Sequence, residues 1–238
     1  MPDVSLPPTP PSLPIVNSTD RFFLRRVYCV GRNYADHARE MGNDPDREPP
    51  FFFTKPADTV FAVDEGFPER GVAAHEVPYP SQTGNLHFEM ELVVAIGGGG
   101  ADIDPADALE HVWGYAAGVD LTRRDLQDQA KSLQRPWDLS KGFDFSGPCS
   151  SLISADSAGH PTAGSIWLTV DGEPRQDGDL ADQIWMVPEV IASLSRFVAL
   201  MPGDLIFTGT PAGVGAVVPG NVVVGGIDGI GELTFRVV

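Results

Sequence analysis

One stretch of the chain, residues 87–96 (His-Phe-Glu-Met-Glu-Leu-Val-Val-Ala-Ile), limits the fold more than any other. Its apolar character and the glycine run 97–100 that ends it predict a β-strand. Because side chains alternate along a strand, Glu89 and Glu91 share one face, with Cα atoms about 6.5–7 Å apart. Two carboxylates directed at one partly buried space repel each other and are costly to desolvate. The strand therefore predicts a compensating cation.

The chemistry of the two glutamates indicates which cation this is. Carboxylate oxygens suit hard ions, so we expect Mg²⁺ or Mn²⁺, with Ca²⁺ as a substitute, rather than zinc. Asp120 follows the small-residue segment 114–119 and would complete an open three-carboxylate site if it faces the same space. The alternative is an exposed strand face that carries two solvated glutamates.

The rest of the chain predicts a β-rich α+β fold. Twenty-six glycines and twenty-two prolines indicate many turns rather than a helical bundle. We expect further strands at 27–31, 51–54, 165–170, 204–207, 222–224 and 233–237, and helices at 32–41, 104–112, 121–133 and 188–200. The length and 42% hydrophobic content allow one sizeable core. We therefore predict a Pro-rich N-terminal arm, 1–20, and a single catalytic domain, 21–238.

The formal net charge of −17 limits the classes of molecule that this chain can bind. Nucleic acid and anionic membrane surfaces are poor partners for such a chain, and an anionic substrate needs a local positive centre. Cys29 and Cys149 are too few for a disulfide scaffold, so a reducing cytoplasm is expected. No stretch has the length of a membrane span, and the first residues lack the features of a signal peptide. These features favour a cytoplasmic protein with a small-molecule partner.

His37 and Glu40 are the candidate proton-transfer pair. They lie three residues apart in a predicted helix, so the carboxylate can hold one imidazole nitrogen. The other nitrogen could then take a proton from water. A pair of this spacing on a helix surface, with no catalytic role, is the more common case.

Arg124 and Gln127 share a predicted helical face and could bind a developing oxyanion. Thr210, in the glycine-rich segment 209–215, could bind a carboxylate together with backbone amides, or the segment could be a tight loop between strands. For the neighbouring charged residues we expect an ordinary helix surface: Arg123, Asp125, Asp128 and Lys131. The motifs of serine hydrolases, zinc proteases, P-loop proteins and dinucleotide-binding proteins are absent from the sequence.

Together these segments resemble the fumarylacetoacetate hydrolase family, in the branch of bacterial acylpyruvate hydrolases. The matching runs lie in the family's order over roughly residues 26 to 238: 31–40, 53–56, 87–92, 114–127, 140–143 and 202–215. Residues 44–53 and the N-terminal extension are most similar to fumarylpyruvate hydrolases of gentisate breakdown. The resemblance implies a mixed β-roll or β-sandwich of the family's C-terminal-domain type with short helices, and a homodimer.

The resemblance also implies roles for single residues. Glu89, Glu91 and Asp120 match the family's Mg²⁺/Mn²⁺ ligands, and His37 with Glu40 matches its water-activating dyad. Lys141 matches a lysine beside the metal and the reacting carbonyl. The expected substrate-binding residues are Arg32, Arg47, Lys55, Arg124, Gln127 and Thr210. Among these, Arg124 and Gln127 match residues near the leaving enolate, Thr210 a substrate-carboxylate contact, and Arg47, with Arg32 as the fallback, is expected at the distal end of the substrate.

The expected reaction is the metal-dependent hydrolysis of a carbon–carbon bond in an acylpyruvate, with 3-fumarylpyruvate giving fumarate and pyruvate. Two alternatives remain. An oxaloacetate or oxo-acid decarboxylase, or an isomerase, would also pass through an enolate at the metal but would not need an activated water. A non-catalytic carboxylate-binding or metal-storage protein would have no reason to place His37 and Glu40 beside the metal.

Overall fold

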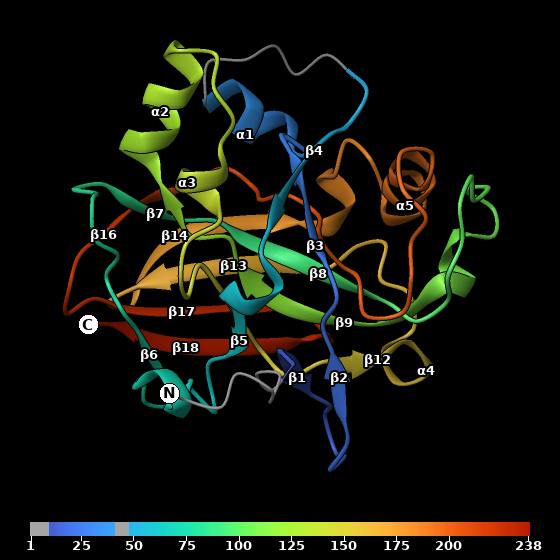
Figure 1. Cartoon of the computed structure of the whole chain (residues 1–238), viewed down its shortest axis with the longest axis horizontal. Coiled ribbons are helices and arrows are strands. Elements are labelled where there is room, and N and C mark those ends of the chain that lie inside the picture. Colours follow the sequence, from blue (N-terminus) through green and yellow to red (C-terminus); the bar gives the residue numbers. More distant parts are fainter. Residues whose placement is uncertain (1–9, 41–47) are drawn as a thin grey trace, which may run out of the picture.

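The computed structural model describes residues 10–40 and 48–238, with only the backbone described at Ala38 and Glu40. Within these ranges the strands form four sheets (Figure 1). The largest sheet has the order β4 (Phe51–Lys55), β3 (Val27–Gly31), β15 (Leu205–Phe207), β8 (Met90–Ile96), β9 (Val112–Val119), β11 (Gly147–Cys149) and β5 (Val60–Ala62), with β12 (Ile153–Ser154) also paired to β9. It is a mixed sheet, because β15 runs parallel to β3 and antiparallel to β8.

The second large sheet is β14 (Glu173–Asp179), β13 (Ser165–Val170), β17 (Val222–Ile227), β18 (Gly231–Val237) and β6 (Glu76–Val77). A smaller sheet joins β10 (Thr122–Arg123), β7 (Leu86–Phe88) and β16 (Gly215–Val217), and β1 (Ser12–Pro14) pairs with β2 (Arg21–Phe23). The predicted β-rich α+β class and the curved, layered β architecture are confirmed.

Both faces of β8 are buried, which places this strand at the centre of the molecule. Met90 and Leu92 point into the main core between the two large sheets. Val93 and Ala95 point to the opposite face, into a second apolar cluster that includes Leu13. Glu91 shares this second face, as the alternation of side chains predicts. The packing on the two faces of the sheet therefore shields the Glu91 side chain from bulk solvent.

The predicted strand 87–96 is in fact two strands. β7 ends at Phe88 in the small sheet and β8 begins at Met90 in the large sheet, so Glu89 occupies the point where the chain changes sheets. The helix expected at Asp104 is also wrong. The Asp104 carboxylate accepts from the amide of Ala106 at 2.9 Å, which closes a local turn, and only a short 3₁₀ turn, Ala108–His111, precedes β9.

The other expected elements are present: the strands 27–31 and 165–170 have the predicted bounds, and the rest have shifted ends. The helices are α1 (Ala35–Glu40), α2 (Arg124–Ser132), α3 (Asp138–Lys141), α4 (Ala155–Ala158) and α5 (Val187–Ser195). β13 and β14 form a hairpin that turns at Asp171 and Gly172, whose φ angles of 52° and 82° suit a tight turn. No described helix has the length and apolar composition that crossing a membrane requires.

The described part of the predicted N-terminal arm is attached to the domain. β1 pairs with β2, and the amide of Leu152 donates to Pro14 at 2.9 Å. Leu13 is fully buried. The division into an arm, 1–20, and a domain, 21–238, remains a prediction.

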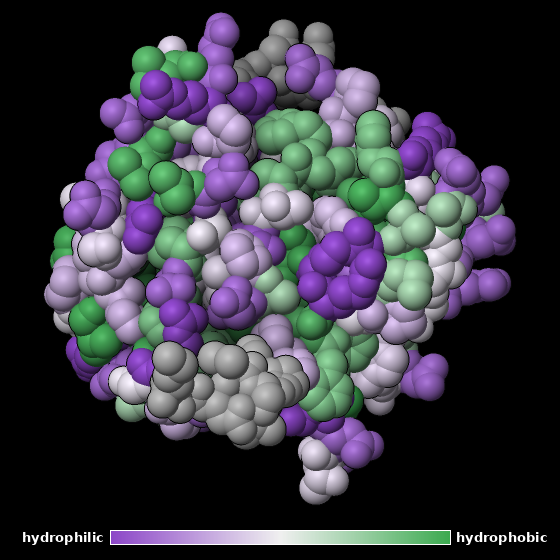
Figure 2. Space-filling view, in the orientation of Figure 1, coloured by the Kyte–Doolittle hydropathy of each residue, from purple (hydrophilic) through white to green (hydrophobic). Residues whose placement is uncertain are grey.

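Three helices gather at one end of the molecule. α1, α2 and α3 lie together on the upper side in Figure 1, near β4, while β17 and β18 of the second large sheet lie on the lower side. On the same face polar and apolar residues alternate, with an apolar area over β4 (Figure 2). The helices therefore cover the end of the sheets at which the acidic side chains lie.

Candidate functional site

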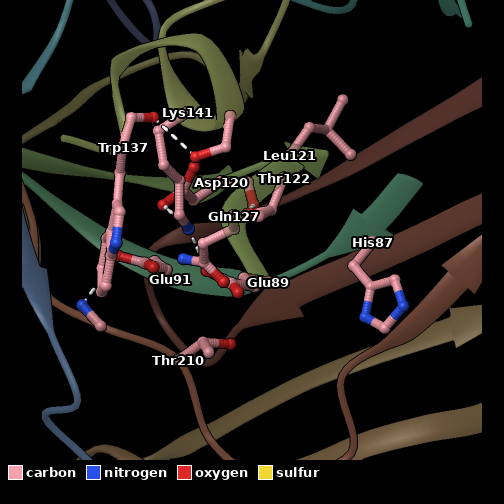
Figure 3. A network of polar contacts seen from close by, with 12 residues as sticks. His87, Glu89, Glu91, Asp120, Leu121, Thr122, Gln127, Trp137, Lys141 and Thr210 are labelled. Carbon is pink, nitrogen blue, oxygen red and sulfur yellow. Dashed lines mark hydrogen bonds and ion pairs between the residues drawn. The ribbon is translucent and has the colours of Figure 1, made fainter. Parts of the chain in front are cut away.

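Glu89, Glu91 and Asp120 meet at the helix-covered end of the sheet, and we call them the carboxylate cluster (Figure 3). One oxygen of each lies within 4.8 Å of the others, and all three side chains are buried. The register of β8 against β9 sets Glu91 opposite Gly118, and the amide of Asp120 donates to the carbonyl of Glu89 at 2.8 Å. Gly118 is required here, because an added Cβ would lie 2.6 Å from the side chain of Val93.

Cations surround two of the three carboxylates. The Lys141 ammonium lies 2.6 Å from both Glu89 Oε2 and Asp120 Oδ2. The Arg124 guanidinium donates to the other oxygen of Glu89, and Lys55 Nζ lies 2.8 Å from Asp120 Oδ1. Glu91 accepts from the amide of Gly209 at 2.7 Å. Among the described residues no cation forms an ion pair with Glu91.

The pKa values of the two glutamates diverge for this reason. Burial favours the protonated form of Glu89, but the charges of Lys141, Arg124 and His37 outweigh burial and hold its pKa well below the usual range. Burial, followed by the charges of Asp120 and Glu89, raises the pKa of Glu91 well above its usual range. A bound cation would remove that penalty.

The cluster fits a divalent metal ion. Its ligand atoms are all carboxylate oxygens, which suits Mg²⁺ or Mn²⁺. Within the described ranges Asp120 Oδ1 has no hydrogen-bond donor in acceptable geometry, although Lys55 Nζ is near it. Glu91 carries the uncompensated charge. A bound cation would give Asp120 Oδ1 a partner and would neutralise the charge of Glu91.

A pocket lined by described residues opens onto the cluster, and we call it the site pocket. Its lining includes most of the residues that the sequence singled out: Arg32, His37, Glu89, Glu91, Arg124, Gln127, Lys141 and Thr210. These residues come from the β3–α1 connection, α1, α2, α3, the β7–β8 junction, β8 and the loop after β15. The fold therefore brings together positions that are up to 178 residues apart, from Arg32 to Thr210.

The polar side chains of the site pocket are held by one another. Arg124 donates to Gln127 Oε1 at 2.5 Å, so the amide nitrogen of Gln127 is left to donate. Thr210 Oγ1 accepts from Gln176 at 2.8 Å, which leaves its hydroxyl proton for another acceptor. Figure 3 shows Thr210 and the Trp137 ring on different sides of the carboxylates. Both positions can reach a ligand in the pocket.

His37 lies on α1, is 7% exposed and lines the site pocket. Its charge is one of those that lower the pKa of Glu89, so the ring stands near the carboxylate cluster. The side chain of Glu40 and the whole of Arg47 lie outside the described residues. The His37–Glu40 pairing and the distal role of Arg47 therefore stay predictions.

Lys55 is placed differently from the other expected substrate-binding residues. Its side chain is fully buried and does not line the site pocket. The ammonium contacts Asp120 Oδ1, the carbonyls of Leu121 and Lys141, and Ser146 Oγ at 3.0 Å. Four oxygen partners, two from residues 120–121 and two from residues 141–146, indicate a structural role behind Asp120.

We expect Lys55→Met to lower the free energy of unfolding of the metal-free protein by about 3–5 kcal/mol, because it leaves a buried carboxylate with one partner fewer. Arg123→Met is the matched control: both cations lie over the Phe143 ring, at 5.6 Å for Lys55 and 4.5 Å for Arg123, but Arg123 is only partly buried. The control should lose about 1 kcal/mol or less. Urea titration measures both, and equal losses would contradict the structural role.

The side chains of the site pocket that sequence reasoning missed include Phe51, Phe53, Lys131 and Trp137. Lys131 was assigned to an ordinary helix surface, and this assignment is wrong. The spacing 124, 127, 131 puts it on the same helical face as Arg124 and Gln127, and this periodicity was the available signal. Trp137 carries no such signal, because it precedes a helix of only four residues.

Comparison with known proteins agrees with this geometry. A family model described as Fumarylacetoacetate (FAA) hydrolase C-terminal matches residues 26–238. The crystal structure of fumarylpyruvate hydrolase from Pseudomonas aeruginosa in complex with Mn²⁺ and pyruvate is 56% identical to this chain, with a TM-score of 0.93, and covers 99% of this chain and 98% of that one.

Two eukaryotic relatives are less similar. The mitochondrial oxaloacetate tautomerase FAHD1 of Rattus norvegicus is 41% identical over 213 residues, which is 90% of this chain and 91% of the relative. The mitochondrial oxaloacetate decarboxylase of Dictyostelium discoideum is 41% identical over 206 residues, with 87% and 90% covered.

Proposed function

The chain belongs to the fumarylacetoacetate hydrolase family, and from this we propose that it hydrolyses a carbon–carbon bond of an acylpyruvate. The preferred substrate in this proposal is 3-fumarylpyruvate, which yields fumarate and pyruvate. The physiological setting that fits is gentisate breakdown in the cytoplasm, by a homodimer.

One observation carries the proposal. His37 lines the same pocket as Glu89 and Glu91, near enough for its charge to act on Glu89. Hydrolysis needs a base for water beside the metal centre, whereas reactions that only form and protonate an enolate do not. The 56% identity to the P. aeruginosa hydrolase, over nearly the full length of both chains, supports the same assignment.

Glu89, Glu91 and Asp120 would hold the divalent ion. When bound, it would supply positive charge to the carboxylate and adjacent keto oxygen of a 2,4-diketo acid. Thr210 would donate its hydroxyl proton to that carboxylate. This arrangement directs the acyl carbonyl toward His37 and Lys141. It also explains how a chain with a net charge of −17 can bind an anion.

In the first step His37 takes a proton from water, and the oxygen of that water attacks the acyl carbonyl. Lys141 stabilises the resulting oxyanion. Its ammonium has three N–H groups, of which two are directed at Glu89 and Asp120 in the described part of the chain, so one can reach the substrate.

In the second step the carbon–carbon bond breaks. The acyl carbon leaves as a carboxylic acid, and the bonding electron pair stays on the other fragment as the enolate of pyruvate. Arg124 and the amide nitrogen of Gln127 stabilise the enolate oxygen until the carbon is protonated. The protons balance, because His37 can give the proton that it took from water to the enolate carbon.

The second candidate function is tautomerisation or decarboxylation of oxaloacetate. The 41% identity to the rat tautomerase and the Dictyostelium decarboxylase favours it. These reactions would use the same carboxylate cluster and pocket, without an attacking water.

A substrate panel distinguishes the two functions. The Mn²⁺-loaded protein is mixed with fumarylpyruvate, acetylpyruvate and oxaloacetate, and loss of the enol absorbance is followed together with product formation. We expect kcat/KM for fumarylpyruvate to exceed that for oxaloacetate by at least about 100-fold, since only a hydrolase gains from an activated water. A preference for oxaloacetate would overturn the proposal.

A further inference from the structure

Two cations of the site pocket are not used by the carboxylate cluster. Among the described residues, the lysines and arginines of the pocket lining are Arg32, Arg124, Lys131 and Lys141. Arg124 and Lys141 form ion pairs with the cluster, whereas no such pair joins Arg32 or Lys131 to it. Among the described residues Lys131 forms an ion pair only with Asp128, at 3.8 Å on the helix surface. These two cations are therefore the ones with charge left for a ligand.

Each of the two cations lies over an aromatic ring. Lys131 Nζ is 5.5 Å from the centre of the Trp137 ring, and the Arg32 guanidinium is 5.4 Å from that of Phe51. The two rings contact each other edge to face at 5.5 Å. Together they form a wall that we call the aromatic wall (Phe51 and Trp137), with a cation at each ring.

The backbone supports this arrangement. An added Cβ at Gly31 would lie 2.0 Å from the Phe51 ring, so the ring position depends on this glycine. Arg32 has a φ angle of 58°, a left-handed conformation that is uncommon for residues other than glycine. Such conformations persist where the surrounding structure holds them, and they concentrate at ligand-binding sites.

The two cations also occupy the outer part of the pocket. The side chain of Lys131 is 31% exposed, whereas those of Glu89 and Asp120 are 7% and 0% exposed. Partial burial, together with the charges of Arg124 and Arg32, lowers the pKa of Lys131. An anion placed between Lys131 and Arg32 would offset that repulsion.

We infer that Lys131, with Arg32, binds a second carboxylate at the far end of the substrate, and that the aromatic wall holds the flat chain between the two ends. This inference rests on the proposed function, because that function places the diketo-acid end at the carboxylate cluster. It identifies the substrate class as dicarboxylic acylpyruvates with an unsaturated acyl chain. Lys131 is thus a specificity residue that contacts substrate but no reacting atom.

The test compares Lys131→Met with the unaltered protein on fumarylpyruvate and on acetylpyruvate, which lacks the distal carboxylate. We expect kcat/KM for fumarylpyruvate to fall about 10–100-fold, the size expected for loss of a charge-assisted hydrogen bond, and that for acetylpyruvate to change less than about 3-fold. Lys131→Arg should restore most of the loss. Asp128→Asn removes the neighbouring carboxylate and should not lower kcat/KM for fumarylpyruvate.

A binding measurement gives a second readout. Fumarate should compete with acetylpyruvate, and its inhibition constant should rise about 10-fold or more in Lys131→Met, while that of oxalate stays the same. Arg236→Met is the matched control for the loss of one positive charge, because Arg236 lies on β18 in the second large sheet and donates to the carbonyl of Gly220. It should change neither constant.

The outcomes separate the two proposals. Parallel changes on both acylpyruvates in Lys131→Met, or none on either, would overturn the distal role and leave the hydrolase function standing. If the unaltered protein cleaves neither acylpyruvate, the proposed function fails. Calorimetric titration of fumarate into the Mn²⁺-loaded protein and its Lys131→Met variant then still decides whether Lys131 binds a carboxylate.

Discussion

Replacing Glu91 with alanine is expected to lower acylpyruvate turnover by about 10³-fold or more while the protein stays folded. Glu91 is the member of the carboxylate cluster with no cation paired to it among the described residues, so it contributes most directly to holding the metal ion. A metal ion supplies several kcal/mol of charge stabilisation to such a reaction, and about 4 kcal/mol corresponds to a 10³-fold change in rate.

The fold should tolerate this change for the same reason. Burial and two neighbouring carboxylates raise the pKa of Glu91, so its ionised form is unfavourable in the metal-free protein. Removing it should leave the free energy of unfolding of the metal-free protein unchanged or slightly higher. Urea titration in the presence of EDTA measures this.

Metal dependence is then measured directly. EDTA should abolish turnover of the unaltered protein, and Mg²⁺ or Mn²⁺ should restore it. Calorimetric titration with Mn²⁺ should show strongly weakened binding in Glu91→Ala. Full activity of a metal-free Glu91→Ala protein would be incompatible with a metal site at this cluster.

Replacing His37 with alanine is expected to reduce acylpyruvate hydrolysis by about 10²–10⁴-fold, the usual cost of losing a general base. His37 lines the site pocket but is not one of the three carboxylates, so Mn²⁺ and oxalate should still bind with little change. Calorimetry measures the binding, and the hydrolysis assay measures the rate.

Oxaloacetate provides the internal control for His37. Its decarboxylation needs no attacking water, so any such activity of the unaltered protein should survive in His37→Ala. If the two activities fall by equal factors, His37 is not a base for water alone. The proposal that His37 activates water while the metal centre binds the substrate would then be wrong.

The sequence was most informative about the position of the acidic side chains, because they lie on a strand whose side chains alternate between two buried faces. The period of two in residues 87–96 correctly placed Glu91 on the face opposite Met90 and Leu92. It did not show that Glu89 lies where the chain passes from one sheet to another, because a change of sheet depends on pairing with β9, β10 and β16, which are distant in sequence.

Local signals failed where a competing hydrogen bond was available. Asp104 followed by proline is a common helix start, yet its carboxylate closes a turn with Ala106. Lys131 was misassigned for another reason: the periodicity that assigned Arg124 and Gln127 to the site also includes Lys131. Only the fold shows that α2 and α3 bring it over Trp137.

The burial of β8 on both faces has an evolutionary consequence. Two layers of packing fix the ligand-bearing strand, so substitutions that move Glu91 also disturb the cores on either side and destabilise the fold. The residues of α1, α2 and α3 lie at the end of the sheets, outside these two cores (Figure 1). A lineage built this way can acquire new reactions by changing its helices while it inherits an unaltered strand. The relatives of this chain that are named as a hydrolase, a tautomerase and a decarboxylase fit such a division of labour.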